Sequence, residues 1–235
     1  MKGFGDLYKD KKKKNKPPTA TIINQAIQFH LQGNIKEATK LYQQLISQEC
    51  NDHRVFSNYG AILHGLGKLK EAIEFYQKGL SLRPDNEDAY KNMALAYQEQ
   101  GNLDEAIKTY KKIILINPEY IEAYNNIGAA YQEKREFKQA IAFYKKVLSI
   151  KPDYAEAFNN IAVSYTDQGN IEEAIAACEK ALLLNPNYVE AYYNLGNAFL
   201  ADKSKLKEAI ASYEKAVSYR PYYAEAHNNM GYALK

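Results

Sequence analysis

The pattern that predicts the fold is clearest in the stretch of residues 121–154, IEAYNNIGAAYQEKREFKQAIAFYKKVLSIKPDY. Two runs within it place apolar and small residues at intervals of three and four, which is the spacing of one helix face. The first run is Tyr124, Ile127, Gly128 and Tyr131, and the second is Ala140, Ile141, Tyr144, Val147 and Leu148. A polar turn at 133–136 separates them, and Lys-Pro at 151–152 ends the second helix, because the residue before proline avoids helical angles. The stretch therefore predicts a hairpin of two short helices.

This hairpin recurs along the chain with a period of 34 residues. The period is marked by Pro84, Pro118, Pro152 and Pro186, and by Ala38, Ala72, Ala106, Ala140 and Ala174. With proline at position 32, the repeats are residues 19–52, 53–86, 87–120, 121–154, 155–188, 189–223 and a partial repeat at 224–235. The sixth repeat has one extra residue near 203–205. Each hairpin must stack on its neighbours to bury its apolar stripe.

The repeat resembles the tetratricopeptide repeat family. The third copy carries the motif residues Tyr90, Met93, Ala94, Tyr97, Gly101, Ala106, Tyr110 and Pro118. Departures are local: Cys50 replaces a proline, Arg135 a turn glycine and Cys178 an aromatic residue. The resemblance implies an all-α, right-handed superhelical solenoid of stacked helix-turn-helix repeats over residues 19–235. Tyrosines at positions 4, 11 and 24 are predicted to form its packing seam.

Charge separates the first 18 residues from the rest of the chain. Residues 1–18 hold seven lysines and two aspartates, whereas the whole chain has a formal net charge of +3, so the remainder is slightly acidic. We expect 1–18 to be a disordered, solubilising tail; the alternative is that Lys11–Lys14 form a nuclear-import signal or contact an anionic surface. The slightly acidic remainder of the chain offers no general positive potential to attract a nucleic acid. No apolar run is long enough to insert into a membrane. A cytoplasmic protein is expected.

Residues that could carry catalysis or hold a metal are few. The chain has no Walker loop, no His-Glu-x-x-His and no Cys-x-x-Cys, so we predict neither an enzyme nor a cofactor. Cys50 and Cys178 lie four repeats apart and cannot pair, and Cys178 is predicted to be a buried, inert thiol. His30 and His64 share position 12 and could face each other, but without a third ligand they predict no metal site.

The most informative pattern is an asparagine at position 6 of every repeat. In the family, positions 5 and 6 of the first helix tend to face the concave groove. An amide there can pair with any peptide bond, because it both donates and accepts. The pattern resembles the asparagine ladder of the superhelical domain of the O-linked N-acetylglucosamine transferase, and it predicts binding of an extended peptide through its backbone. The alternative is inherited surface polarity. The candidate residues are Asn24, Asn58, Asn92, Asn126, Asn160, Asn194 and Asn229, with Asn125 and Asn159 at position 5.

Acidic residues predict that the groove is negatively charged. They stand at position 2 as Asp88, Glu122, Glu156, Glu190 and Glu225, and at position 13 as Glu99, Glu133 and Asp167. An acidic groove favours neutral to basic peptides. The alternative is that acids in a first helical turn complement the helix dipole, which accounts for position 2 but not for position 13.

The last helix of the sequence, 224–235, carries Met230, Tyr232 and Leu234 with no following repeat to cover them. A solenoid normally ends in a polar cap. We therefore expect the chain to be the first part of a longer protein. The predicted function is a protein-interaction scaffold that binds a peptide in its groove; the alternative is the substrate-recruiting arm of a longer, glycosyltransferase-like transferase.

Overall fold

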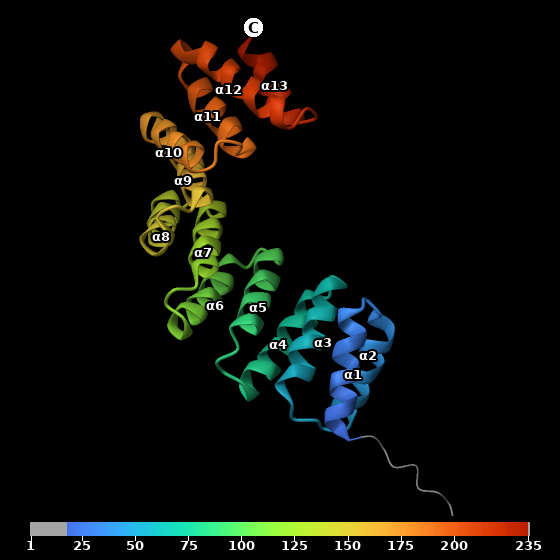
Figure 1. Cartoon of the computed structure of the whole chain (residues 1–235). Helices are drawn as coiled ribbons and strands as arrows, with labels where there is room; N and C mark the ends of the chain where they lie inside the picture. Colours follow the sequence, from blue (N-terminus) through green and yellow to red (C-terminus); the bar gives the residue numbers. More distant parts are fainter. Residues whose placement is uncertain (1–17, 235) are drawn as a thin grey trace, which may run out of the picture. The chain divides into compact units, whose positions relative to one another are not determined.

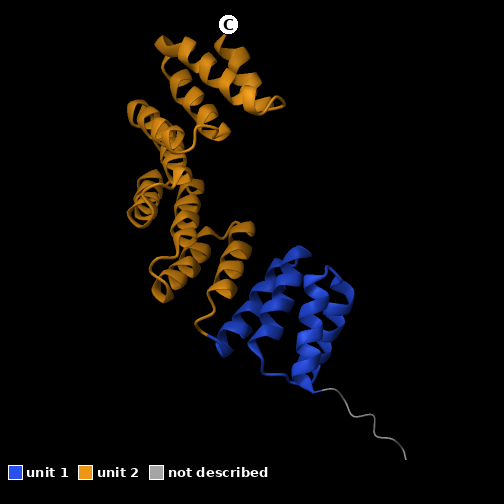
Figure 2. Cartoon of the chain, in the orientation of Figure 1, with its two compact units in different colours: residues 1–83 blue, residues 84–235 orange. Residues whose placement is uncertain are grey.

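The computed structural model describes residues 18–234, and within them it contains α-helices, one short 3-10 turn and no strand. The chain divides into two compact units, residues 1–83 and residues 84–235 (Figure 2). The prediction of an all-α fold built from helical repeats is confirmed. The predicted basic tail, apart from Pro18, lies outside the described residues.

The first compact unit holds two helix hairpins (Figure 1). Its helices are α1 (Thr19–Leu31), α2 (Ile35–Ser47), α3 (His53–Gly65) and α4 (Leu69–Leu82). Each helix packs on the next, and α1 also contacts α3. The first helices of successive repeats therefore lie against each other, as stacked hairpins require.

The second compact unit continues the same arrangement from the third repeat onward (Figure 1). Consecutive helices pack together, and α7 contacts α9, α9 contacts α11, and α11 contacts α13. A short 3-10 turn, η1 (Lys203–Lys205), lies where the sixth repeat has its extra residue. The helices are α5 (Glu87–Glu99), α6 (Leu103–Ile116), α7 (Ile121–Glu133), α8 (Phe137–Ile150), α9 (Ala155–Gln168), α10 (Ile171–Leu184), α11 (Val189–Ala201), α12 (Leu206–Tyr219) and α13 (Ala224–Ala233).

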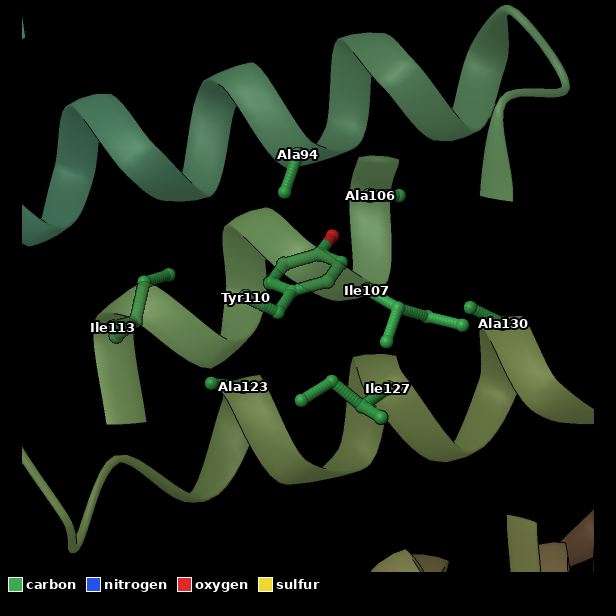
Figure 3. Close-up of a cluster of buried hydrophobic side chains, with 8 residues drawn as sticks. All are labelled: Ala94, Ala106, Ile107, Tyr110, Ile113, Ala123, Ile127 and Ala130. Atoms are coloured by element: carbon green, nitrogen blue, oxygen red, sulfur yellow. The ribbon is translucent and has the colours of Figure 1, made fainter. Parts of the chain in front are cut away.

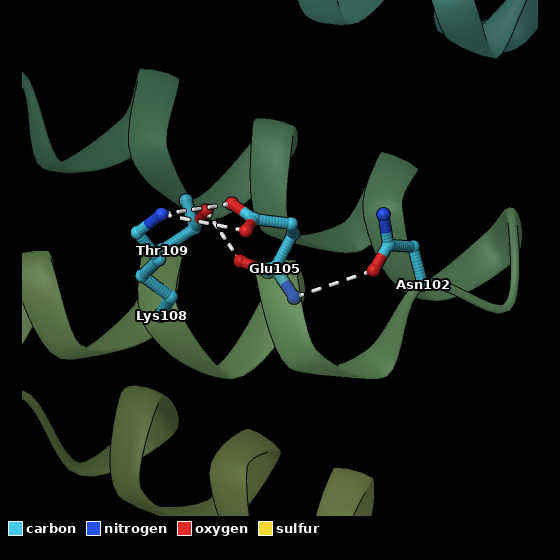
Figure 4. A network of polar contacts seen from close by, with 4 residues as sticks. All are labelled: Asn102, Glu105, Lys108 and Thr109. Carbon is cyan, nitrogen blue, oxygen red and sulfur yellow. Dashed lines mark hydrogen bonds and ion pairs between the residues drawn. The ribbon is translucent and has the colours of Figure 1, made fainter.

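Turns between paired helices use left-handed backbone and asparagine caps. Gly101 and Gly169 have φ of 75° and 79°, and Arg135 takes the same conformation with φ of 61°, where the turns of the first, second, third and fifth repeats have glycine. At the start of α6, Asn102 accepts a hydrogen bond from the Glu105 backbone N–H at 3.4 Å (Figure 4). Lys108 pairs with the Glu105 carboxylate, and the Thr109 hydroxyl donates to the Glu105 carbonyl at 2.7 Å. The Asn102 cap satisfies a backbone N–H that the start of a helix otherwise leaves unpaired.

The core of five of the six complete repeats contains a tyrosine at position 24 that packs against small residues. Figure 3 shows Tyr110 of α6 lying between Ala94 of α5 and Ala123 and Ile127 of α7. Tyr110 is fully buried, as are Tyr42, Tyr76 and Tyr213. The predicted role of these tyrosines in packing is thus confirmed for position 24. In the fifth repeat Cys178 takes this place as a free, buried thiol, and burial raises its pKa to about 12, which keeps it protonated and inert.

Glycine at position 8 of the fourth repeat lies in close contact with the position-24 tyrosine, whereas the third repeat has Ala94 there. A Cβ added to Gly128 would lie 2.6 Å from the Tyr144 ring, whereas one added to Gly231, at the same position of the last repeat, would meet nothing within 4 Å. We expect overpacking in Gly128→Ala to lower the free energy of unfolding by about 1–3 kcal/mol. The higher helix propensity of alanine offsets part of this loss. Gly231→Ala should gain up to about 1 kcal/mol from propensity alone. Urea unfolding followed by circular dichroism measures the difference; equal effects would contradict this packing.

Candidate functional site

The predicted ladder asparagines differ in how far they are buried. Asn24, which has no preceding repeat, is exposed, and Asn159 is buried. The other candidate asparagines are half-buried: Asn58, Asn92, Asn125, Asn126, Asn160, Asn194 and Asn229. Most of these amides therefore lie partly between helices rather than standing free in solvent.

Neighbouring repeats are joined by hydrogen bonds between these amides. Asn160 Nδ2 donates to Asn125 Oδ1 at 3.2 Å, and Asn194 Nδ2 donates to Asn159 Oδ1 at 2.9 Å. In both pairs, position 6 of one repeat donates to position 5 of the repeat before it. The structure thus brings Asn125, Asn159, Asn160 and Asn194 together in two adjacent pairs along α7, α9 and α11.

Other position-6 asparagines face the buried tyrosine of the preceding repeat. Burial raises the pKa of Tyr42 and of Tyr110 to about 12, and the side chains of Asn58 and Asn126, respectively, oppose that rise. Neither tyrosine hydroxyl makes a hydrogen bond of standard geometry within the described residues, so the amide contact is a loose one. Asn58 and Asn126 thus lie near the buried tyrosine hydroxyls of the preceding repeats.

In the last repeat, the position-6 asparagine also forms hydrogen bonds with side chains of the preceding repeat. Asn229 Nδ2 donates to Asn197 Oδ1 at 2.9 Å and to the Tyr193 hydroxyl at 3.3 Å. The Tyr213 hydroxyl donates to the same Asn197 oxygen at 2.8 Å. The network ties α13 to α11 and to α12.

A groove of about 400 Å³ lies beside the Asn125–Asn160 pair, between α7 and α9. Both amides line it, and Ala129 leaves space between them. The rim carries the carboxylates of Glu133, Glu156 and Asp167, at positions 13, 2 and 13 of their repeats; Gln132 and Tyr144 complete the lining. The structure therefore joins two of the predicted amides with three of the predicted acids in one site.

Gln132 organises the floor of this groove, and sequence reasoning missed it. Its Oε1 lies 3.1 Å from the Tyr144 hydroxyl, which donates to it, and 3.1 Å from the Ser164 hydroxyl. Ser164 is fully buried and stands where Ala96, Ala130 and Ala198 occupy the same repeat position. A serine at a position that is alanine in these repeats could have indicated the role of Gln132, because a buried hydroxyl needs a hydrogen-bond partner.

The groove is acidic, and one of its carboxylates, that of Glu156, accepts hydrogen bonds from neighbouring side chains. Glu156 accepts from Asn125 Nδ2 at 3.1 Å and from the Tyr154 hydroxyl at 2.9 Å. Burial and the charge of Glu156 both raise the pKa of Tyr144, so its hydroxyl remains a donor at neutral pH. None of the described residues that line the groove is basic.

Some of the predicted acids are neutralised elsewhere in the fold. Glu190 is ion-paired with Arg220, and Asp88 pairs with Lys91 at 3.3 Å. Of the predicted acids, Glu133, Glu156 and Asp167 are the three that line this groove, and none of them forms an ion pair among the described residues.

Of the two histidines at position 12, His30 packs against an aromatic ring. His30 packs edge-on against the Tyr42 ring, with centroids 6.4 Å apart, and burial lowers its pKa. Across residues 18–234, no group of three or more His, Cys, Asp or Glu side chains is placed to hold a metal ion. Over the same residues, every helix is too short or too polar to cross a bilayer.

Solved structures share this architecture. MamA is 25% identical, with a TM-score of 0.63 over 74% of this chain and 94% of that chain. YrrB, described as a TPR protein with an unusual peptide-binding site, is 20% identical, with a TM-score of 0.61 over 80% and 96%. The C-terminal part of a TPR repeat-containing protein from Cytophaga hutchinsonii is 20% identical, with a TM-score of 0.76 over 90% and 84%. None of the curated proteins compared with the chain matches it.

Family models match the chain in overlapping segments. Models described as tetratricopeptide repeat or TPR repeat match residues 32–87, 63–131, 121–154, 155–188, 177–211 and 199–235. The matched segments run through the residues that build the groove, and this fold supports a protein-interaction module. With its 34-residue period, paired helices and buried position-24 tyrosines, the chain belongs to the tetratricopeptide repeat family.

Proposed function

We propose that the chain is a scaffold that binds an extended, neutral to basic peptide segment in the groove between α7 and α9. The observation that carries the proposal is the pairing of the Asn125 and Asn160 amides with an acidic rim. Amides can pair with peptide groups whatever the side chains are. The exposed carboxylates of Glu133 and Asp167 attract lysine and arginine side chains of the ligand.

The inter-repeat bonds leave capacity for a ligand. A side-chain amide has two N–H donors and a carbonyl oxygen. Asn160 uses one N–H on Asn125, so its second N–H and its oxygen can serve a peptide group. Because the amide is already oriented by its neighbour, less side-chain entropy is lost when a peptide binds.

Two further considerations support a binding role. Tetratricopeptide proteins are typically non-catalytic scaffolds, and YrrB is described as having a peptide-binding site. We accordingly propose a non-catalytic, cytoplasmic binding module. A substrate-recruiting arm of a longer transferase would use the same groove, so the experiment below would also identify the segment that such an arm recruits.

The test is a peptide array that contains neutral, basic and acidic extended sequences. Wild-type protein is compared with the double variant Glu133→Lys, Asp167→Lys, which reverses two rim charges that make no hydrogen bond within the fold described here. We expect wild type to prefer neutral and basic peptides. The variant should bind these peptides at least about tenfold more weakly, because its new lysines repel basic side chains of the peptide.

The matched control reverses two other exposed acids. Glu172→Lys, Glu173→Lys makes the same change in net charge on α10, away from the groove. This control should bind the array as wild type does. If both double variants lose the same peptides, binding follows net charge and the groove is not the site.

A further inference from the structure

A second cavity, of about 400 Å³, lies on α6 and shares no lining residue with the groove. Its floor is apolar: Ile107 is buried there, and Tyr131 of α7 forms one wall while stacking on Phe143 at 5.5 Å. Leu115 stands at its edge with 77% of its surface exposed. A large apolar side chain exposed beside an apolar cavity is a feature of surfaces that bind partners.

The cavity is also strongly basic. Lys108, Lys111 and Lys112 line it, and all three are exposed. The acid in the lining, Asp104, forms an ion pair at 2.8 Å with Lys134, which also pairs with Glu136 at 2.7 Å, so three lysines face one partly compensated carboxylate. Lys108 is held by Glu105 at 3.3 Å, so Lys111 and Lys112 carry most of the available positive charge.

This combination is not inherited from the repeat pattern. The fifth repeat also exposes a leucine at position 29, Leu183, with 74% of its surface accessible. At the positions equivalent to Lys108 and Lys111, however, that repeat has Ala176 and Glu179. The fourth and sixth repeats keep a lysine at some of these positions but have serine in place of the leucine. Among repeats three to six, the third alone combines three lysines with the exposed leucine, because the fifth keeps only Lys180, at the position of Lys112.

We propose that this face of α6 docks an acidic protein segment that carries a bulky apolar side chain. Charge complementarity selects the partner: carboxylates of the segment pair with Lys111 and Lys112. The apolar side chain of the segment enters the cavity against Leu115 and Ile107, as an anchor residue does at a protein interface. The apolar floor favours a protein segment over a nucleic acid, whose phosphates would need only the lysines.

The probe is a fluorescein-labelled peptide in which Leu-Phe is flanked on each side by three alternating Asp and Glu residues. A matched peptide has Ser-Asn in place of Leu-Phe, and a single-stranded oligonucleotide of equal charge is the third ligand. We expect full-length protein to bind the first peptide at least fivefold more tightly than the other two, measured by fluorescence anisotropy at physiological salt.

The variants take residues from equivalent positions of the other repeats. Lys111→Glu should weaken binding of the first peptide at least tenfold, and Leu115→Ser at least fivefold. Leu183→Ser is the control and should bind as wild type. The proposal is overturned if the two peptides bind equally, if Leu115→Ser has no effect, if no peptide binds, or if the oligonucleotide binds as tightly as the first peptide. Because no groove residue is altered, these outcomes are independent of the proposed groove function.

Discussion

Ala140→Trp is expected to lose at least about 1–3 kcal/mol of unfolding free energy. Ala140 is fully buried in α8, at a position where every complete repeat has alanine, and it packs in the cluster of Tyr144, Ile161 and Ala162. An indole has no space there without moving α7 or α9. Urea unfolding followed by circular dichroism measures the loss.

The matched control lies two residues away on the same helix. Ala142 is exposed, so Ala142→Trp should change stability by no more than about 0.5 kcal/mol. The wild-type chain contains no tryptophan, so each variant also carries its own fluorescence reporter. A destabilised Ala142→Trp beside an unchanged Ala140→Trp would show that the helix register is wrong.

Asn126→Ala is expected to cost about 1–3 kcal/mol, whereas Asn24→Ala should cost less than about 0.5 kcal/mol. Both residues occupy position 6, but Asn126 is half-buried against the Tyr110 hydroxyl and Asn24 is exposed. Removing the Asn126 amide leaves that buried hydroxyl without the group that faces it. Chemical unfolding of the two variants provides the comparison.

A double-mutant cycle separates this contact from other effects of the substitution. Tyr110→Phe removes the hydroxyl, so adding Asn126→Ala to it should cost less than Asn126→Ala costs in wild type. Additive losses, or equal losses at Asn24 and Asn126, would mean that the ladder position has no structural contact with the tyrosine.

Much of the fold follows from the 34-residue spacing. The period predicts where each helix pair lies, and the prolines at position 32 account for the ends of the second helices. Position-24 tyrosines could be assigned to the core because helix periodicity places them on the apolar face. The division of the chain at Arg83 and Pro84 could not be predicted, since the repeat pattern continues through those residues without a change.

The sequence indicates which face of the helices carries the candidate asparagines, but not which hydrogen bonds they form. Asparagine columns at positions 5 and 6 indicate one side of the first helices, yet the distance between successive helices determines that Asn160 donates to Asn125. Likewise, Arg220 neutralises Glu190 from 30 residues away, which no single repeat reveals. Contacts between repeats depend on side-chain reach across a stacked interface, and sequence periodicity does not encode that reach.

The central claim is that the groove between α7 and α9 reads the backbone of an extended peptide. The most direct test compares the tightest-binding basic peptide of the array with a copy that is N-methylated at its central backbone amides, by isothermal titration calorimetry. We predict at least tenfold weaker binding of the methylated copy, because about 1.4 kcal/mol is lost with one hydrogen bond to the asparagine amides. Equal binding of the two peptides, together with loss of binding when single side chains of the parent are changed to alanine, would contradict the claim.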